Sequence, residues 1–267
     1  MSHDKNVHDK KMHDKKSYDK KENENIIEGR NAVMEAFRSG KPVDKLYVLD
    51  GCQDGAVRSI IREARKHDTI LNFVEKDRLN QLSETGKHQG VIASVAAYEY
   101  AEVEDMLKLA EEKGEDPFLI ILDNIEDPHN LGAIIRTANL AGAHGVIIPK
   151  RRAVGLTSTV AKTSAGALNY TPVAKVTNLG HTIDELKEQG MWFVCADMGG
   201  ETMYNLNLTG PIGVVIGNEG EGVSRLIREK CDFVASIPMK GDIDSLNASV
   251  AAGVLGYEIV RQRLQKK

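Results

Sequence analysis

Residues 118–136 read FLIILDNIEDPHNLGAIIR and set the pattern of the C-terminal half of the chain. The opening run, 118–122, is apolar throughout, which is typical of a strand covered on both faces of a parallel sheet. Strands and helices are expected to alternate along the rest of the chain. The strands are expected at 146–148, 192–196 and 212–216, and the helices at 130–141, 181–189, 221–229 and 247–264. The last helix would place Val250, Val254, Leu255 and Ile259 on one side. This order of elements predicts a parallel α/β sheet.

The N-terminal part of the chain has two segments of different character. Residues 1–22 repeat a His-Asp-Lys theme with few aliphatic side chains, so they cannot bury enough surface to offset the entropy lost on ordering. We therefore expect a disordered tail over 1–24. A small α/β module is predicted over 25–98, with a helix ending near Gly40, a helix at 57–66, and strands at 46–49, 70–74 and 91–95.

Residues 99–116 are charged, contain a helical stretch from Val103 to Glu112, and are expected to be a linker that docks on one domain. The second domain is expected to span 117–267.

The composition is that of a water-soluble globular protein, with 41% apolar and 28% charged residues. No apolar run is long enough for a transmembrane helix, and the first residues lack the apolar core of a signal peptide. Cys52, Cys195 and Cys231 are scattered, so neither a disulfide framework nor a zinc site is predicted. The expected location is the cytoplasm.

The formal net charge of −4 argues against a protein that holds nucleic acid by broad electrostatic attraction. Contact with RNA would have to come from local basic patches. One candidate is the run Lys150, Arg151 and Arg152, which directly follows the strand ending at Pro149. Three cations at the end of a strand are a candidate phosphate clamp, and a solvated loop is the competing interpretation.

Three polar islands interrupt the apolar pattern of the second domain. They are NIEDPHNLGAIIR at 124–136, IGNEGEG at 216–222, and a third that runs from Ile237-Pro238-Met239 to SLNASVA at 245–251. One island alone would be weak, because Asn, Gly and Pro cluster in any turn. Together and in this order they resemble the three signature motifs of the SpoU/TrmH family, which transfers methyl groups from S-adenosylmethionine to ribose 2′-hydroxyls of RNA.

This resemblance implies a fold as well as an activity. It implies a C-terminal α/β domain with a deep trefoil knot that cradles S-adenosylmethionine, a preceding small RNA-binding domain similar to ribosomal proteins, a homodimer and no metal. The segment GKHQGV at 86–91 resembles the one that closes the N-terminal domain of the bacterial 23S ribosomal RNA guanosine methyltransferases. In that module Arg30 and His88 are candidates for RNA contact, although a His before a strand is often held by the backbone.

Two other functions remain open. A transfer-RNA enzyme of the same family is one, although such enzymes commonly lack the N-terminal module. A non-catalytic RNA-binding or ribosome-assembly factor is the other. A dinucleotide-dependent oxidoreductase is disfavoured, because the glycine-rich segment 217–222 comes late in the chain and carries two acids where phosphates would lie.

In the first island the resemblance assigns catalytic roles to Asn130 and Arg136. Asn130 stands at the expected helix start, where simple capping competes evenly with a role in orienting the ribose. By the same resemblance, Arg136 is the catalytic arginine. The alternative is that its side chain forms a surface salt bridge. Because it follows two apolar residues, its side chain could be half-buried. A guanidinium releases its proton reluctantly, so we expect a permanent charge that pairs with a phosphate and stabilises the developing alkoxide.

In the second island the resemblance carries over Gly217 and Glu219. Gly217 would leave room for backbone to approach the adenosyl group. Glu219 would face the ligand or support Arg136, and a solvated turn acid is the alternative.

In the third island Ile237 and Leu246 carry over as cofactor-binding residues, and Ser245 and Asn247 as catalytic ones. An extended segment would aim Ser245 and Asn247 to one side and Leu246 to the other. Ser-x-Asn before a helix is also typical of a simple cap.

Overall fold

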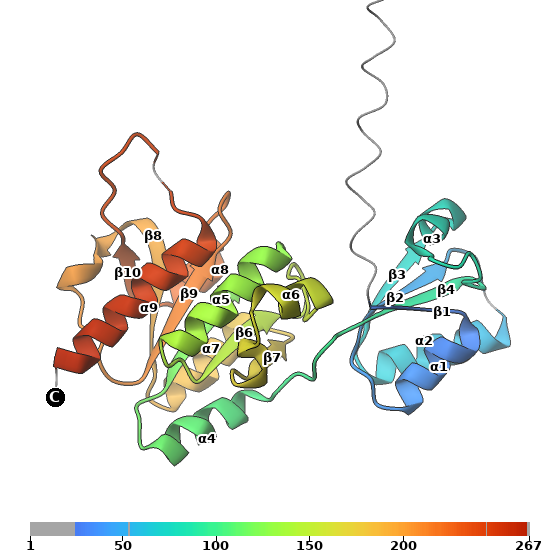
Figure 1. The fold of residues 1–267 in the computed structure, drawn as a ribbon, viewed down its shortest axis with the longest axis horizontal. Helices are drawn as coiled ribbons and strands as arrows, with labels where there is room; N and C mark the ends of the chain where they lie inside the picture. The colour runs from blue at the N-terminus through green and yellow to red at the C-terminus, as the bar shows by residue number, and fades with distance from the viewer. Residues whose placement is uncertain (1–24, 53, 244, 266–267) are drawn as a thin grey trace, which may run out of the picture. The chain divides into compact units, whose positions relative to one another are not determined.

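The computed structural model describes residues 25–52, 54–243 and 245–265, which divide into two compact units between Val95 and Ala96. Figure 1 shows the elements of each unit. The expected tail, 1–24, lies outside the described residues. Among the described helices, none is both long and apolar enough to span a membrane.

The N-terminal unit is a four-stranded sheet in the order β1-β4-β2-β3 with three helices. Its elements are β1 (Ile26–Glu28), α1 (Arg30–Arg38), β2 (Val43–Leu49), α2 (Gly55–Lys66), β3 (Ile70–Val74), α3 (Lys76–Leu82) and β4 (Val91–Val95). Helices α1 and α2 bury Val33, Phe37, Val57 and Ile60 against one face of the sheet. Helix α3 was not predicted, because its seven residues offer one buried apolar side chain, Leu79, and no periodicity.

The C-terminal unit holds a six-stranded sheet, entirely parallel, in the order β10-β8-β9-β5-β6-β7. Its strands are β5 (Phe118–Asp123), β6 (Gly145–Pro149), β7 (Val173–Val176), β8 (Trp192–Thr202), β9 (Ile212–Gly217) and β10 (Phe233–Ser236). Its α-helices are α4 (Val103–Lys113), α5 (Pro128–Leu140), α6 (Ser158–Thr163), α7 (Leu179–Glu188), α8 (Arg225–Lys230) and α9 (Ala248–Gln265), with the short 3-10 turns η1 (Ala167–Asn169) and η2 (Met203–Asn205). The predicted parallel α/β sheet is confirmed.

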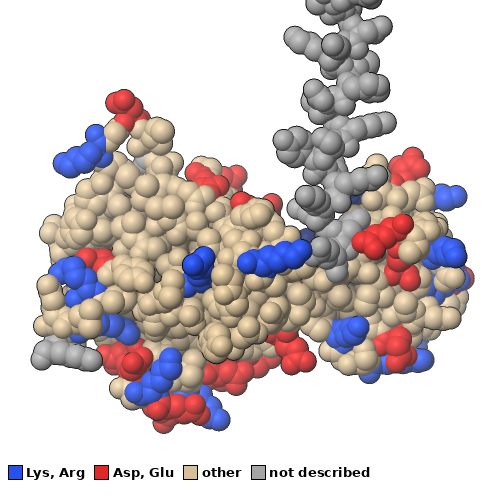
Figure 2. Space-filling view, viewed as in Figure 1, with Lys and Arg blue, Asp and Glu red and all other residues tan. Residues whose placement is uncertain are grey.

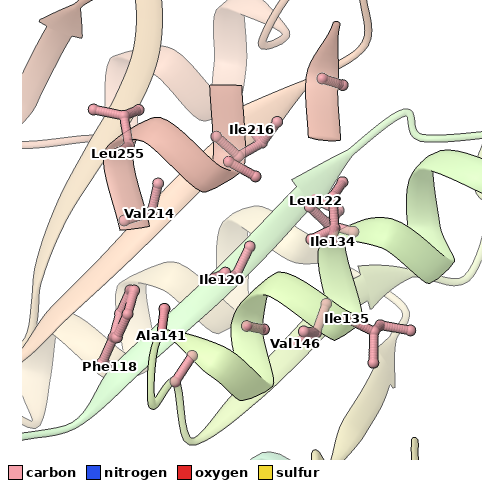
Figure 3. Close-up of a cluster of buried hydrophobic side chains, with 14 of the residues drawn as sticks. Phe118, Ile120, Leu122, Ile134, Ile135, Ala141, Val146, Val214, Ile216 and Leu255 are labelled. Atoms are coloured by element: carbon pink, nitrogen blue, oxygen red, sulfur yellow. The ribbon is translucent and has the colours of Figure 1, made fainter. Parts of the chain in front are cut away.

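Helices cover both faces of this sheet, so its central strands are buried throughout. Helices α5, α6 and α9 pack on one face, where Ile134 of α5 and Leu255 of α9 join Ile120 and Leu122 of β5 in one buried cluster (Figure 3). Helices α4, α7 and α8 pack on the other face. Helix α4 lies in the segment expected to be a linker; its Met106 and Ala110 are fully buried in the C-terminal unit.

Two details of the helices differ from expectation. Helix α8 begins at Arg225 rather than near 221, because residues 218–222 are folded into a turn. On α9, the four apolar residues expected on one side are not all buried, because the Val250 side chain is 48% exposed. The buried side of this helix is instead lined by Ala248, Ala252, Leu255 and Ile259.

Candidate active site at the carboxyl edge of the sheet

The three polar islands meet at one edge of the six-stranded sheet. The first follows β5, the second follows β9, and the third follows β10. These strands are parallel, so their carboxyl ends share an edge, which is where ligands bind in open α/β sheets. The edge therefore gathers segments that are far apart in the sequence.

The loop after β9 is held in one shape by its own backbone. A side chain at Gly217 would place its Cβ 2.0 Å from the carbonyl carbon of Gly222, so only glycine fits there. Asn218 Oδ1 accepts hydrogen bonds from the backbone N–H groups of Gly220 and Glu221, over 3.0 Å and 2.6 Å. Gly217 was expected to leave space for a ligand, but the backbone of Gly222 occupies the space beside its Cα.

A buried carboxylate anchors the far end of this loop. Asp123, at the end of β5, is 6% exposed, and its Oδ2 accepts a 2.7 Å hydrogen bond from the backbone N–H of Ser224. Asp123 pairs in register with Gly217 on the neighbouring strand. The segment 217–224 is thus fixed at both ends, which holds the Glu219 backbone in place.

Asn130, Glu219 and Asn247 form a hydrogen-bonded cluster at this edge, which we call the carboxylate–amide cluster. Asn130 Nδ2 donates to Glu219 Oε1 over 2.9 Å. Asn247 Nδ2 donates to Asn130 Oδ1 over 2.9 Å and also to Glu219 Oε1. One residue from each island takes part, so the cluster joins all three.

The cluster departs from the expected capping roles. Asp127 caps α5, since its side chain accepts from the N–H of His129 over 2.9 Å; Asn130 lies inside the helix, is 7% exposed, and leaves its amide for the cluster. Of the two alternatives for Asn130, the one that makes it the N-cap is therefore wrong. Asn247 both caps α9 and belongs to the cluster, because its Oδ1 accepts from the N–H of Ser249 at the start of α9 while its Nδ2 donates to Asn130.

One side of the cluster opens into a cavity of about 220 Å³, which we call the first cavity. Its walls come from the middle of β8, from the loops after β9 and β10 and from the start of α9, including Gly217, Ile237, Met239, Ser245 and Leu246. The expected alternation around Leu246 is wrong: Ser245 and Leu246 both line this cavity, whereas Asn247 turns to the cluster.

The charged side chains of the first cavity are all acidic among the described residues. They are Asp197, Glu219 and Glu221. A cationic ligand without phosphates fits such a lining, because a phosphate would meet like charges at short range. S-adenosylmethionine, with a sulfonium and no phosphate, satisfies this condition; a dinucleotide does not.

Asp197 is a site residue that the sequence did not reveal. Strand β10 pairs Val234 with Cys195 and then Ala235 with Glu201, so residues 196–200 leave the ladder and bulge into the cavity wall. Arg228 Nε lies 3.1 Å from Asp197 Oδ2 and orients it. Such a large register shift has no local signal beyond the two glycines, Gly199 and Gly200.

On the other side of the same loop lies a second cavity of about 650 Å³. Asn130 and Arg152 line it together with residues 124–127. Residues 218–221 line both cavities, so the Glu219 loop is a shared wall. The arrangement offers one chamber suited to a cationic donor and an adjoining one that contains an arginine.

The remaining basic candidates are not all at this edge. Of the run after β6, Arg152 lines the second cavity, Arg151 is exposed outside both cavity walls, and Lys150 is half-buried. Arg136 is exposed on α5 and lines neither cavity, so a half-buried position is excluded in the single chain.

In the N-terminal unit, Arg30 and His88 are engaged within the unit itself. Arg30 Nη2 donates to Asp54 Oδ2 over 2.6 Å, and its Nε donates to the Gln89 carbonyl oxygen. His88 is 7% exposed; its Nδ1 accepts from the N–H of Gly90, and its Nε2 lies 3.2 Å from Asn80 Oδ1. Both ring nitrogens are occupied, which is the geometry of a structural histidine and opposes direct RNA contact.

No group of three or more metal-binding side chains occurs within the part of the chain that the structure describes.

Comparison with known proteins agrees with both units. Residues 117–257 match the family model of the SpoU rRNA Methylase family, and residues 26–101 match the model described as RNA 2'-O ribose methyltransferase substrate binding. The chain is 50% identical over 243 residues to "Putative TrmH family tRNA/rRNA methyltransferase YacO" of Bacillus subtilis, which covers 91% of this chain and 97% of that protein. It is 46% identical to a relative with the same family name from Staphylococcus haemolyticus, over 90% of this chain and 96% of the relative.

Solved structures show the same kinship. The SpoU methyltransferase AviRb from Streptomyces viridochromogenes, in complex with the cofactor AdoMet, is 28% identical with a TM-score of 0.57, over 90% of each chain. The A. aeolicus TrmH/SpoU tRNA modifying enzyme is 29% identical with a TM-score of 0.53, over 61% of this chain and 84% of that one. The protein belongs to the SpoU/TrmH family of RNA methyltransferases, with S-adenosylmethionine as its methyl donor.

Proposed function

We propose that this protein methylates a ribose 2′-hydroxyl of RNA, with a guanosine of 23S ribosomal RNA as its target. The observation that carries the proposal is the position of the carboxylate–amide cluster, whose Glu219 lies in the wall shared by the two cavities. A donor held in the first cavity and a nucleotide held in the second would meet at this wall. The cluster would then position the two reacting groups.

The first cavity would hold the donor through acidic side chains on one part of its wall and apolar side chains on another. Bound S-adenosylmethionine supplies a methyl group on a positively charged sulfur. Asp197 and Glu219 favour that positive charge, and Ile237, Met239 and Leu246 offer apolar surface for the adenine. Ser245, also in this wall, contributes a hydroxyl for hydrogen bonding.

The second cavity would hold the nucleotide that is methylated. Among the described residues, its walls hold the acids Glu126, Asp127, Glu219 and Glu221 and one cation, Arg152. We assign the phosphate of the nucleotide to Arg152, because guanidinium groups bind phosphate oxygens in pairs, and the ribose to the acidic side of the cavity. Asn130 borders the same space, and its amide orientation is fixed by Glu219 and Asn247. Lys150 and Arg151 precede Arg152 in the chain, and the exposed Arg151 adds positive charge outside the cavity wall.

We further propose that the active form is a homodimer in which Arg136 acts at the partner's site. Arg136 shares the outer stripe of α5 with Leu140, which is 64% exposed. The adjoining outer stripe of α9 exposes Val250 and Tyr257, and α5 packs beside α9. Exposed apolar side chains on two neighbouring helices suit contact with a second copy of the chain. Burial there would bring the permanently charged Arg136 into a drier environment, where it stabilises a developing alkoxide more strongly.

Ribosomal RNA is favoured over transfer RNA by the N-terminal unit. That unit matches the substrate-binding family model, whereas the tRNA-modifying relative from A. aeolicus overlaps 61% of this chain. The alternatives are tRNA methylation and a non-catalytic role in ribosome assembly. The retained carboxylate–amide cluster and acidic cavity count against the last of these.

Incubation with labelled S-adenosylmethionine tests the proposal. Unmodified transcripts of 23S ribosomal RNA and of tRNAs are offered separately, and label is mapped to a ribose or a base by nuclease digestion. We expect a single ribose-methylated guanosine in the 23S transcript. Label on tRNA alone would establish the tRNA alternative, and RNA binding with no label on either transcript, despite bound donor, would indicate an assembly factor.

A further inference from the structure

Helix α2 carries a larger net positive charge than any other described helix. Arg58, Arg62, Arg65 and Lys66 stand against one acid, Glu63, in twelve residues. The whole segment 25–95 has eleven Lys and Arg against ten Asp and Glu, so without this helix it would be acidic. The segment 96–267 has seventeen against twenty-three, and Figure 2 shows acidic side chains gathered along the edge of the C-terminal unit that carries α4.

The positive side chains of α2 project from one outer face. Val57, Ile60 and Ala64 are fully or almost fully buried, which fixes the opposite side of the helix in the core. Arg58, Arg62 and Arg65 follow the spacing i, i+4 and i+7 and are exposed. At a rise of 1.5 Å per residue they extend over roughly 10 Å, enough to face successive phosphates of one strand.

Two of these arginines are available to an outside partner. Glu63 pairs with Lys66 over 2.7 Å. Arg62 and Arg65 take part in no ion pair within the described ranges 25–52, 54–243 and 245–265. An unneutralised cation pair on the surface of an acidic protein is a local electrostatic attractor for polyanions.

An exposed aromatic ring flanks this helix. Strand β3 is the edge strand beside β2, and α2 packs over these two strands. Phe73 pairs in register with the core residue Val48, so its side chain is on the face that α2 covers, yet it is 53% exposed. Aromatic rings next to cations are typical of surfaces that bind single-stranded nucleic acid, where the ring stacks on a base.

We propose that the outer face of α2, with Arg62 and Arg65 at its centre and Phe73 at its margin, binds the phosphate backbone of the RNA substrate. This inference rests on the proposed RNA substrate and assigns it a surface remote in sequence from the three islands. An anionic membrane is the competing partner for a basic amphipathic helix. It is disfavoured because the apolar side of α2 is committed to the core and cannot enter a bilayer.

The salt dependence of RNA affinity tests the proposal. The full-length double variant Arg62→Gln/Arg65→Gln is compared with wild type for binding to unmodified 23S transcript at several KCl concentrations. Each lost phosphate contact lowers the slope of log affinity against log salt by about 0.7–0.9, so we expect a decrease of about 1.4–1.8. The KM for RNA should rise at least about tenfold with kcat retained, because the cavities are untouched.

Two controls separate this surface from general charge effects. Lys76→Gln/Arg78→Gln on α3 removes the same charge from the same unit and should change affinity less than about twofold. Phe73→Ala should weaken binding without altering the salt slope, because stacking releases no counterions.

The inference would be overturned if the wild type and the α2 variant had equal slopes of log affinity against log salt. It would also be overturned if both double variants lost the same amount of RNA affinity. A loss confined to binding of phosphatidylserine vesicles would overturn it as well. A wild-type protein that methylates neither transcript overturns the proposed function instead, and an α2-dependent slope would still support this surface. Circular dichroism melts verify that each variant is folded.

Discussion

Asn247 Nδ2 donates a hydrogen bond of 2.9 Å to Asn130 Oδ1, although the two residues are 117 positions apart in the chain. Asn130 uses its other amide atom toward Glu219, and Asn247 uses its own oxygen toward Ser249. Each amide group therefore has one orientation that satisfies its partners. A network of this kind is rigid because every rotation would lose more than one hydrogen bond.

Replacing Glu219 should show how much the cluster depends on this acceptor. Glu219→Ala leaves the amides of Asn130 and Asn247 without their shared acceptor. Each buried amide without an acceptor lowers the free energy of unfolding by about 1–3 kcal/mol. We expect the melting temperature to fall by several degrees and kcat to fall about 100-fold as the site loosens. Glu219→Gln keeps an oxygen acceptor and should melt near wild type, so its kcat isolates the effect of charge. Equal melting temperatures for the two variants would contradict this account.

A methyl group at Gly217 should disrupt the wall between the cavities. The added Cβ would lie 2.0 Å from the carbonyl carbon of Gly222, which is backbone and cannot rotate away. Gly217→Ala is therefore expected to lower the melting temperature and to weaken S-adenosylmethionine binding at least tenfold (about 1.4 kcal/mol) in calorimetry. Gly220→Ala is the matched control, since its nearest neighbour, Asn218 Oδ1, lies at an ordinary 3.7 Å. Similar losses in both variants would argue against the steric explanation.

Much of the fold was predictable, because the buried strands of a parallel sheet have continuously apolar sequences. The runs at 118–122 and 212–216 are the adjacent central strands β5 and β9. Within the six-stranded sheet, the strands that escaped prediction are β7 and β10, which have four residues each and lie at its two edges. A run of four residues with one polar member, VAKV in β7 and FVAS in β10, is too short to be told from the surrounding loops by periodicity.

The site was predictable in composition and less so in geometry. The islands contain Asn130, Glu219 and Asn247, but their mutual hydrogen bonds depend on strand order, which is a property of the folded sheet. Asp197 was missed because its place in the cavity results from a break in strand pairing. Arg136 was identified from the motif, yet its six-residue offset from Asn130 turns it to a different side of α5.

Mixed dimers should reveal whether Arg136 acts at the partner's site. Arg136→Ala alone is expected to lower kcat about 100-fold or more, with S-adenosylmethionine affinity unchanged, because its side chain lies outside the first cavity. Asn247→Ala is expected to be inactive because it removes one member of the carboxylate–amide cluster. When the two variants are co-expressed and assemble randomly, half the dimers are mixed, and each mixed dimer would contain one intact site. Roughly a quarter of wild-type activity should then return.

The control for this experiment is Arg136→Ala mixed with itself after separate purification and recombination, which should regain nothing. Absence of recovery in verified mixed dimers would mean that Arg136 acts within its own chain or not at all.

A buried histidine should make stability fall in weak acid. His144 has a fully buried side chain; its Nδ1 accepts from the N–H of Phe118 over 3.0 Å, and its Nε2 lies 3.1 Å from Glu115 Oε2. Burial lowers the pKa of His144 below its ordinary value, a shift that Glu115 opposes in part. The unfolded chain, with a histidine pKa of about 6.5, therefore takes up this proton before the folded one does.

The contribution of His144 to the free energy of unfolding is complete above about pH 6.5 and declines as pH falls toward the folded-state pKa, by at most about 1.4 kcal/mol per pH unit. Urea unfolding at a series of pH values between about 7.5 and 5 measures it. His144→Asn keeps an acceptor for the Phe118 N–H but cannot titrate, so its stability should vary less over this window. His181→Gln removes an exposed histidine and should behave as wild type. If His144→Asn shows the full wild-type dependence, another group titrates in its place.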